Sequence, residues 1–402
     1  MRYSYLAVAL AAALGTTVSF NAAAAEGVDS AELAALKAQL AELQAKVAEL
    51  ETRTDAQSDV NIEQAKTNEA VVPAVDSLKK TVNDTKIGGR LFIDMTNRDE
   101  KVNGVKTNNS GTGFDVTRFY LTVDHKFDDI WSANLTSDAQ YLSFGSGAGA
   151  NQASSVEVFI KKAYVQAKFS NALFVRAGAA DAPWIPFVEK YYGMRYVQNT
   201  LVDRLSYGTS ADWGLHVGGD TDNGLTYAAS VTNGRGYRNP SRSETVDFEG
   251  RLGWAPTAST IIGIGAYTGK RGNDTATVNP PQTAKRVNAM AAYAGTKLRL
   301  GAEWFQADNW AVTNVIEDSA AGWSAWASYA LTDSGITAFG RYDDVDTSKD
   351  VNPAFGNTYW HLGVEFPVIK GIKLAAVYKD TTAKTASKTE TQEFGIWGDV
   401  QF

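Results

Sequence analysis

The sequence predicts an all-β protein, a transmembrane antiparallel barrel of about sixteen strands preceded by a short α-helical coiled coil. Three observations support this prediction. From residue 87 onward, apolar and polar residues alternate with a period of two, in segments of roughly ten residues. The connections between these segments are alternately short and long. A heptad repeat of apolar residues precedes the first segment.

Composition narrows the class of protein. The chain has 402 residues, no cysteine and a formal net charge of −7. Beyond the N-terminus, no stretch reaches the roughly 18 apolar residues that a membrane-spanning helix needs. The negative charge argues against a nucleic-acid partner. An exported chain without cysteine needs a source of stability other than disulfides, such as backbone hydrogen bonds that close around a barrel.

Residues 1–25 are predicted to be a cleaved signal peptide. Arg2 supplies a positive charge, residues 6–14 form an apolar stretch, and three alanines at 23–25 precede Glu26 as a small-residue cleavage site. The alternative is an amphipathic or buried N-terminal helix. The signal peptide predicts that the mature protein leaves the cytoplasm.

Residues 26–54 are predicted to form a coiled coil that joins copies of the chain. Steps of three and four place its apolar residues at successive a and d positions: Leu33, Leu36, Leu40, Leu43, Val47 and Leu50. Charged residues flank this seam at Glu32, Lys37, Lys46 and Glu51. The alternative is one amphipathic helix that packs on its own domain. Residues 55–86 lose the apolar repeat, contain Pro73 and are predicted to be a linker.

Residues 87–402 are predicted to form the barrel. Sixteen strands are expected at residues 87–97, 115–126, 130–143, 156–169, 172–180, 211–220, 224–233, 246–255, 259–269, 285–295, 297–306, 321–330, 335–343, 357–366, 371–380 and 391–402. Alternation of short and long connections is typical of outer-membrane barrels, whose turns face the periplasm and whose loops face outward. A barrel of this size leaves an aqueous channel rather than a filled core.

Basic side chains outnumber acidic ones on the predicted inner faces of the strands, and the third loop carries further basic residues. The candidates for lining the pore or binding solute are Arg118, Lys162, Arg176, Arg195, Arg204, Arg251, Arg299 and Arg341. In a narrow channel such a surplus raises the local anion concentration, and guanidinium groups bind carboxylate or phosphate. The alternative is that these charges form salt bridges that brace the barrel wall.

The longest loop, residues 181–210, is expected to fold into the channel and narrow it. It carries Trp184, Phe187, Tyr191, Tyr192 and Tyr196 among charged residues. An exposed loop rarely has so many aromatic side chains. The alternatives are packing against a neighbouring subunit or over the mouth of the barrel.

An enzyme is not predicted. His125, His216 and His361 show neither the spacing of metal ligands nor a recognisable Ser/His pairing. No catalytic residue, metal or cofactor is therefore expected.

Taken together, these features resemble those of a known family. The signal peptide, the leucine-rich coiled coil, the sixteen amphipathic strands, the segments TRFYL at 117–121 and FDDIWS at 127–132, and the terminal Phe402 are similar to trimeric outer-membrane porins. The nearest group is the phosphate-selective porin O/P group with its coiled-coil-bearing dicarboxylate relatives. The resemblance implies a homo-oligomer, a trimer as in that group, with the coiled coil in the periplasm and Phe402 as the signal read by the barrel-assembly machinery.

The expected function is passive diffusion of small hydrophilic solutes across the outer membrane, with a preference for anions such as phosphate or carboxylates. Expected partners are further copies of the chain, outer-membrane lipids, the barrel-assembly machinery and small anionic solutes. The alternative is a structural or adhesive surface barrel whose lumen is occluded.

Overall fold

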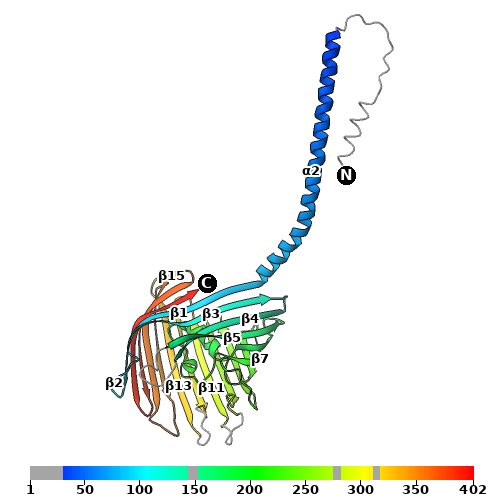
Figure 1. Ribbon diagram of the computed structural model, residues 1–402. Coiled ribbons are helices and arrows are strands. Elements are labelled where there is room, and N and C mark those ends of the chain that lie inside the picture. Colours follow the sequence, from blue (N-terminus) through cyan, green and yellow to red (C-terminus); the bar gives the residue numbers. More distant parts are fainter. Residues whose placement is uncertain (1–29, 144–152, 275–281, 311–316) are drawn as a thin grey trace. The chain divides into compact units, whose positions relative to one another are not determined.

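The computed structural model describes residues 30–143, 153–274, 282–310 and 317–402. The predicted signal peptide lies outside these ranges. Contacts divide the chain into two units, residues 1–79 and 80–402. Figure 1 colours the chain in sequence order and labels α2 and several of the strands.

One long helix, α2 (Ser30–Asp84), dominates the first unit. It includes the predicted coiled-coil segment, but it also continues through residues 55–84, which were predicted to be a linker. Of these 30 residues, 11 are Ala, Glu, Gln or Lys, which favour helix, and 16 are Val, Asp, Asn, Ser or Thr, which favour it less. Pro73 removes one backbone donor without ending the helix. Among the described residues, no helix is both long enough and apolar enough to span a membrane.

The second unit is a single antiparallel sheet. Its strands are β1 (Thr85–Val102), β2 (Val105–Lys106), β3 (Gly111–Lys126), β4 (Trp131–Ser143), β5 (Ala153–Lys168), β6 (Phe174–Asp181), β7 (Ala211–Asp220), β8 (Leu225–Thr232), β9 (Asp247–Thr257), β10 (Thr260–Gly269), β11 (Ala284–Ala294), β12 (Leu298–Asp308), β13 (Ser319–Ala330), β14 (Thr337–Asp346), β15 (Gly356–Ile369), β16 (Ile372–Lys384) and β17 (Lys388–Gln401). The two-residue β2 only extends the hairpin between β1 and β3. The other strands coincide with the sixteen that the sequence predicts.

The sheet closes into a barrel because β1 pairs with β3 on one side and with β17 on the other. The closing pair runs from Arg90 opposite Gln401 to Val102 opposite Thr389. Phe402 adds two backbone hydrogen bonds to Gly89, 2.8 and 3.1 Å long. The ladder between β3 and β4 is shorter than these strands and runs only from Leu121 opposite Ser137 to Lys126 opposite Ser132, so the two strands separate beyond it.

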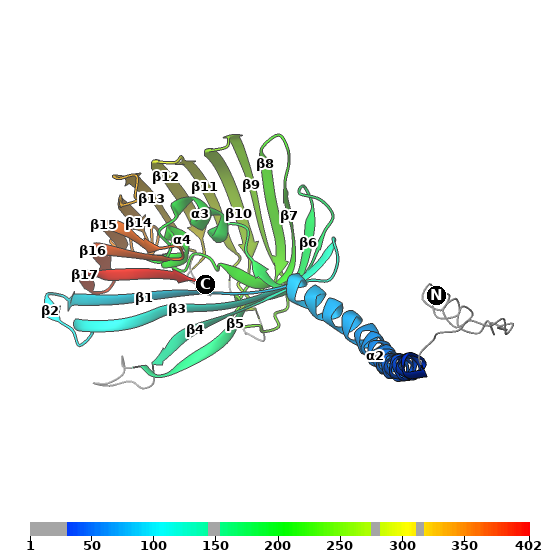
Figure 2. The same ribbon diagram turned by 90° about the horizontal axis from the view of Figure 1, so that it is seen from above.

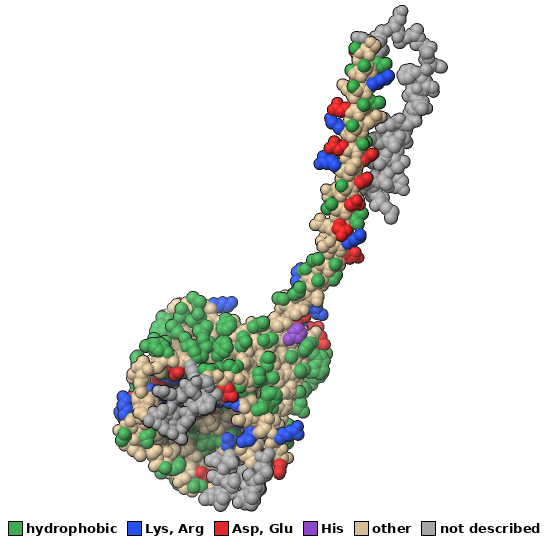
Figure 3. All heavy atoms as spheres, viewed as in Figure 1, with side chains coloured by type: hydrophobic (Ala, Val, Ile, Leu, Met, Phe, Trp, Pro, Cys, Tyr) green, Lys and Arg blue, Asp and Glu red, His purple; other side chains and the backbone are tan. Residues whose placement is uncertain are grey.

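The two faces of the strands differ as predicted. In β12, Leu298, Leu300 and Trp304 are exposed on the outside, whereas Glu303 and Phe305 are buried toward the lumen. Apolar side chains cover much of the outer surface of the barrel in Figure 3. An apolar outer surface suits contact with lipid.

The connection between β6 and β7 folds into the barrel. This connection, residues 182–210, is named the lumen loop and contains the short helices α3 (Ile185–Tyr192) and α4 (Leu201–Arg204). Figure 2 shows both helices inside the ring of strands. Trp184 and Leu201 are fully buried there. The expectation that this loop enters the channel is confirmed.

Candidate functional site

The lumen loop begins with a short amphipathic helix. Pro186 stands in the first turn of α3, where its missing N–H is not needed. Ile185 and Val188 turn a buried face toward the barrel core. The helix ends at Gly193, whose φ of 80° is the left-handed conformation that glycine adopts readily. A side chain at this position would also lie only 2.8 Å from Nη1 of Arg299.

The second half of the lumen loop is fixed to the wall formed by β12, β14 and β16. Four hydrogen bonds join them: Arg341 to the carbonyl of Asn199 (2.5 Å), Lys379 to the carbonyl of Val197 (2.8 Å), the backbone N–H of Leu201 to Glu303 (2.8 Å), and Arg204 to Asp343 (3.0 Å). All the wall residues in this set are buried. These bonds hold the lumen loop in a defined position against the inner wall of the barrel.

Three of the predicted pore-lining residues serve this attachment. Arg204 and Arg341 both contact Asp343. Arg299 donates from Nη1 to the carbonyl of Tyr191, 3.1 Å away, at the end of α3. The contacts of these three arginines hold the loop and the barrel wall together, as expected if lumen charges brace the wall rather than bind solute.

Two further predicted residues, Arg118 and Arg195, are paired with carboxylates. Arg118 contacts Asp138 at 3.2 Å. Arg195 contacts Glu189 at 2.5 Å and Asp203 at 3.5 Å, both within the lumen loop. Burial alone would lower the pKa of Arg195, but these two carboxylates help to hold it above its ordinary value. Arg195 therefore remains positively charged.

A β-bulge places two successive lysines of β5 on the inside. The pairing with β4 passes from Lys162 to Ile160, which leaves Lys161 out of the regular register. Lys161 contacts the hydroxyl of Tyr120 at 3.1 Å, and Lys162 forms an ion pair with Asp181 at 2.6 Å. Strict alternation predicts only Lys162 on the inner face, so the sequence analysis missed Lys161.

A polar recess beside the lumen loop carries cations that have no carboxylate partner among the described residues. This recess, named the basic recess, has a volume of about 560 Å³, and its lining includes Arg176, Lys190 and Arg251. Within the described parts of the chain, none of these three forms an ion pair with a carboxylate. Asp181 and Asp220 also line it, but Asp181 is already paired with Lys162. The basic recess therefore has an excess of positive charge.

Neutral partners hold the two arginines of the basic recess. Arg176 donates to Gln166 at 2.8 Å, and its guanidinium lies 4.4 Å from the ring centre of Phe174. Arg251 donates to the carbonyl of Pro183 at 3.1 Å and lies 4.1 Å from the ring centre of Phe187. Aromatic faces and amide oxygens orient a guanidinium without neutralising it.

A second recess, of about 240 Å³, has mixed charge. Its basic residues are Arg98, Arg118, Arg195 and Lys379, and its acidic residues are Asp94, Asp115 and Glu393. Asp94 and Asp115 stand directly opposite each other on β1 and β3. Positive and negative side chains both line this recess, whereas the basic recess has an excess of positive charge.

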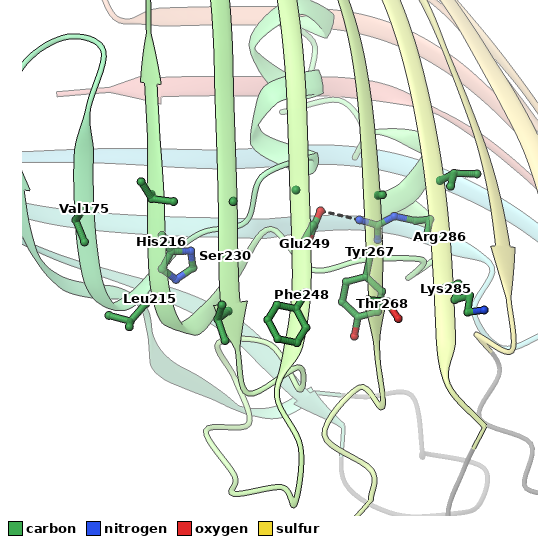
Figure 4. Close-up of a pocket in the computed structure, with 16 residues that line it drawn as sticks. Val175, Leu215, His216, Ser230, Phe248, Glu249, Tyr267, Thr268, Lys285 and Arg286 are labelled. Carbon is green, nitrogen blue, oxygen red and sulfur yellow. Dashed lines mark hydrogen bonds and ion pairs between the residues drawn. The ribbon is translucent and has the colours of Figure 1, made fainter.

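Glu249 of β9 and Arg286 of β11 form an ion pair of 2.7 Å. Figure 4 shows the two side chains pointing toward each other. Arg286 also donates to the carbonyl of Tyr207 in the loop. The ion pair joins two strands of the wall, and the hydrogen bond from Arg286 to Tyr207 attaches the loop to them.

The remaining predicted residues are the seam of α2 and the terminal Phe402. The six apolar residues from Leu33 to Leu50 are exposed on α2. Phe402 is also exposed, and its ring lies against Gly89 of β1. Among the described residues, no group of acidic or histidine side chains is arranged to hold a metal ion. The recesses of this lumen are lined by charged and aromatic side chains.

Comparison with known proteins supports this description. The family model "Phosphate-selective porin O and P" matches residues 85–268. No curated protein matches the chain. The solved structures that it resembles are far below 25% identical, so they bear on the fold alone.

Two solved structures illustrate the likeness. An anion-selective porin from Comamonas acidovorans aligns with a TM-score of 0.57 and 12% identity, over 79% of this chain and 99% of that chain. OprB of Pseudomonas putida aligns with a TM-score of 0.57 and 11% identity, over 82% of this chain and 96% of that chain.

A third is OmpT of Vibrio cholerae in a trimer form, with a TM-score of 0.51 and 12% identity over 79% of this chain and 99% of that chain. The similarity of OmpT to this chain is again one of barrel fold. The closed sixteen-strand barrel, the inward loop and the family match lead to one conclusion. The chain is an outer-membrane β-barrel porin, and its residues 85–268 match the model of the phosphate-selective porin O and P family.

Proposed function

We propose that this porin is a passive diffusion channel for small hydrophilic solutes and that it prefers anions such as phosphate or carboxylates. The observation that carries the proposal is the basic recess, where Arg176, Lys190 and Arg251 face an open volume of about 560 Å³. A small anion passing the lumen loop can exchange water for guanidinium and ammonium donors there. Because binding sites of this kind are shallow and partly hydrated, they admit an anion without trapping it.

The names of the relatives agree with this proposal. The matching family is described as phosphate-selective, and one similar structure is an anion-selective porin. The choice between phosphate and carboxylate depends on the spacing of the donors along the whole path, which the basic recess alone does not set. Phosphate and small carboxylates therefore form one proposed class of solute.

The proposal includes how the protein is assembled. Several copies, a trimer by analogy with the trimer form of OmpT, associate in the outer membrane among its lipids. The seam from Leu33 to Leu50 joins the copies on the periplasmic side. Phe402 is the signal that the barrel-assembly machinery reads.

Planar-bilayer recording tests the proposal. The purified oligomer should give stepwise currents with anion preference, whereas an occluded structural or adhesive barrel would give none. Arg176→Glu and Arg251→Glu should each reduce the anion preference, because each moves the local charge by two units. Lys349→Glu on the connection between β14 and β15 is a matched charge reversal away from the basic recess and should have a much smaller effect. Equal effects of all three variants would contradict a role for the basic recess.

A further inference from the structure

The a and d positions of α2 continue in one phase far beyond Leu50. Continuing the alternating steps of four and three brings the register to Thr54, Gln57, Asn61, Gln64 and Asn68, and then to Val71, Val75, Leu78 and Val82. The first set is named the polar block and the second the distal seam. The repeat therefore changes its residue type after Leu50 without an insertion or deletion in its phase.

The helix is continuous through both segments. α2 has 55 residues, and none of them is buried. Val71 and Leu78 of the distal seam are 48% and 64% exposed, close to the values for Val47 and Leu50 in the first seam. At 1.5 Å per residue the helix is about 80 Å long. Most helices in proteins owe their stability to packing of an apolar face, and this face has no cover within the described chain.

Pro73 does not interrupt the seam. In the register set by Leu33 and Leu36 it occupies an f position, which faces away from the partner helix in a coiled coil. Its ring and its missing N–H therefore lie on the outer side. Pro73, which suggested a linker in the sequence, is thus compatible with pairing along the whole helix.

Charges beside the first seam favour identical partners. In a parallel, in-register coiled coil, a residue at g lies near the residue at e of the following heptad on the next helix. This geometry brings Glu32 near Lys37 of another copy and Lys46 near Glu51 of another copy. Both pairs have opposite charges. In the single chain Lys46 contacts Glu42 at 3.1 Å, but both side chains are largely exposed, so this pair is weak and can exchange.

The polar block also suits a shared interface. Its a and d side chains are hydroxyl and amide groups without charge, so like residues from neighbouring helices can hydrogen-bond to each other. A polar residue such as Asn at an a position lowers stability but fixes the register of a coiled coil. Asn61 and Asn68 both occupy a positions.

We propose that α2 pairs with the same helix of other copies along residues 33–82, as one parallel, in-register coiled coil with the polar block in its middle. Residues 55–84 are then part of the oligomer interface. This inference rests on the proposed homo-oligomer and extends its contact by the polar block and the distal seam. The occupant of the exposed face is another copy of this chain.

Cysteine cross-linking tests the proposal, because the chain contains no cysteine of its own. Single cysteines are introduced into the full chain at Gln64 and Leu78, both d positions. Leu43→Cys is the reference in the first seam, and Lys66→Cys at an f position is the control. A disulfide requires the two Cα atoms to lie within about 7 Å, so linking the same residue of two copies at separated points requires parallel, in-register helices.

After oxidation of the purified oligomer, Gln64→Cys and Leu78→Cys should form covalent dimers about as efficiently as Leu43→Cys, and several-fold more than Lys66→Cys. If either variant links no better than Lys66→Cys while Leu43→Cys links well, the extended interface is wrong and the first seam stands. If Leu43→Cys also fails, the coiled-coil oligomer itself is wrong. Conductance of the same samples tests transport separately.

Discussion

Replacing Arg341 with alanine should loosen the lumen loop from the barrel wall. The Arg341 side chain is 1% exposed and forms an ion pair of 2.7 Å with Asp343. It also donates to Ser324 at 3.1 Å and to the carbonyl of Asn199 at 2.5 Å. Alanine removes the direct bond to the loop and half of a buried ion pair at the same time.

The energetic cost of Arg341→Ala depends on the contacts that Asp343 keeps after the substitution. The Asp343 side chain is 0% exposed, and Arg204, at 3.0 Å, is its other cationic partner among the described residues. Removing one partner of a buried ion pair costs about 3 to 5 kcal/mol. Because Arg204 stays in place, we expect the lower end of this range, ~3 kcal/mol. This ion pair lies within β14, so the contribution of Arg341 to holding the loop is its charged hydrogen bond to the carbonyl of Asn199. A hydrogen bond to a charged group is worth about 1.5–3 kcal/mol, so its loss shifts the balance between the attached and the detached loop by about ten- to a hundredfold.

Single-channel recording measures this change. Arg341→Ala should give a larger mean conductance and noisier open-channel current, because the loop spends more time away from the wall. Arg176→Ala is the matched control, since it removes a lumen arginine that contacts no carboxylate and should leave the noise unchanged. If Arg341→Ala forms heat-modifiable oligomers whose conductance and noise equal those of the wild type, the loop does not depend on this anchor.

Three further predictions concern other contacts. Gly193→Val should also increase current noise, because a left-handed conformation costs about 1–2 kcal/mol for residues other than glycine and the new side chain meets Arg299; unchanged noise would contradict this. Leu36→Asp with Leu43→Asp should lower the melting temperature of the oligomer on semi-native gels, since both charges lie at d positions; an unchanged temperature would exclude a stabilising role for the seam. Deletion of Phe402 should lower the yield in the outer membrane and leave precursor in the periplasm, whereas a wild-type yield would remove its role as an assembly signal.

The barrel could be predicted from the sequence because lipid and water impose opposite requirements on successive residues of each strand. The run Leu298, Leu300 and Trp304 against Arg299 and Glu303 shows this alternation without any knowledge of distant contacts. Length and composition of the third loop likewise predicted its inward fold, since Trp184 and its aromatic neighbours need cover from water. The local sequence pattern was therefore sufficient to predict both the barrel strands and the inward loop.

The roles of individual lumen charges could not be predicted in this way. Whether an arginine faces a carboxylate depends on residues far away in the chain, as for Arg204 and Asp343, and not on its place in a strand. Lys161 faces inward because of a bulge, which local alternation does not reveal. The extent of α2 was missed because apolar periodicity fades after Leu50 while the heptad phase continues.

The central claim is that cations beside the lumen loop, which have no carboxylate partner among the described residues, make this channel prefer anions. The most direct measurement is the reversal potential of the wild-type channel in a gradient of potassium chloride at low ionic strength. Charge effects weaken within about 10 Å at 0.1 M salt, so the predicted result is an anion preference that declines as the salt concentration rises. A channel that prefers potassium over chloride throughout this range would contradict the claim.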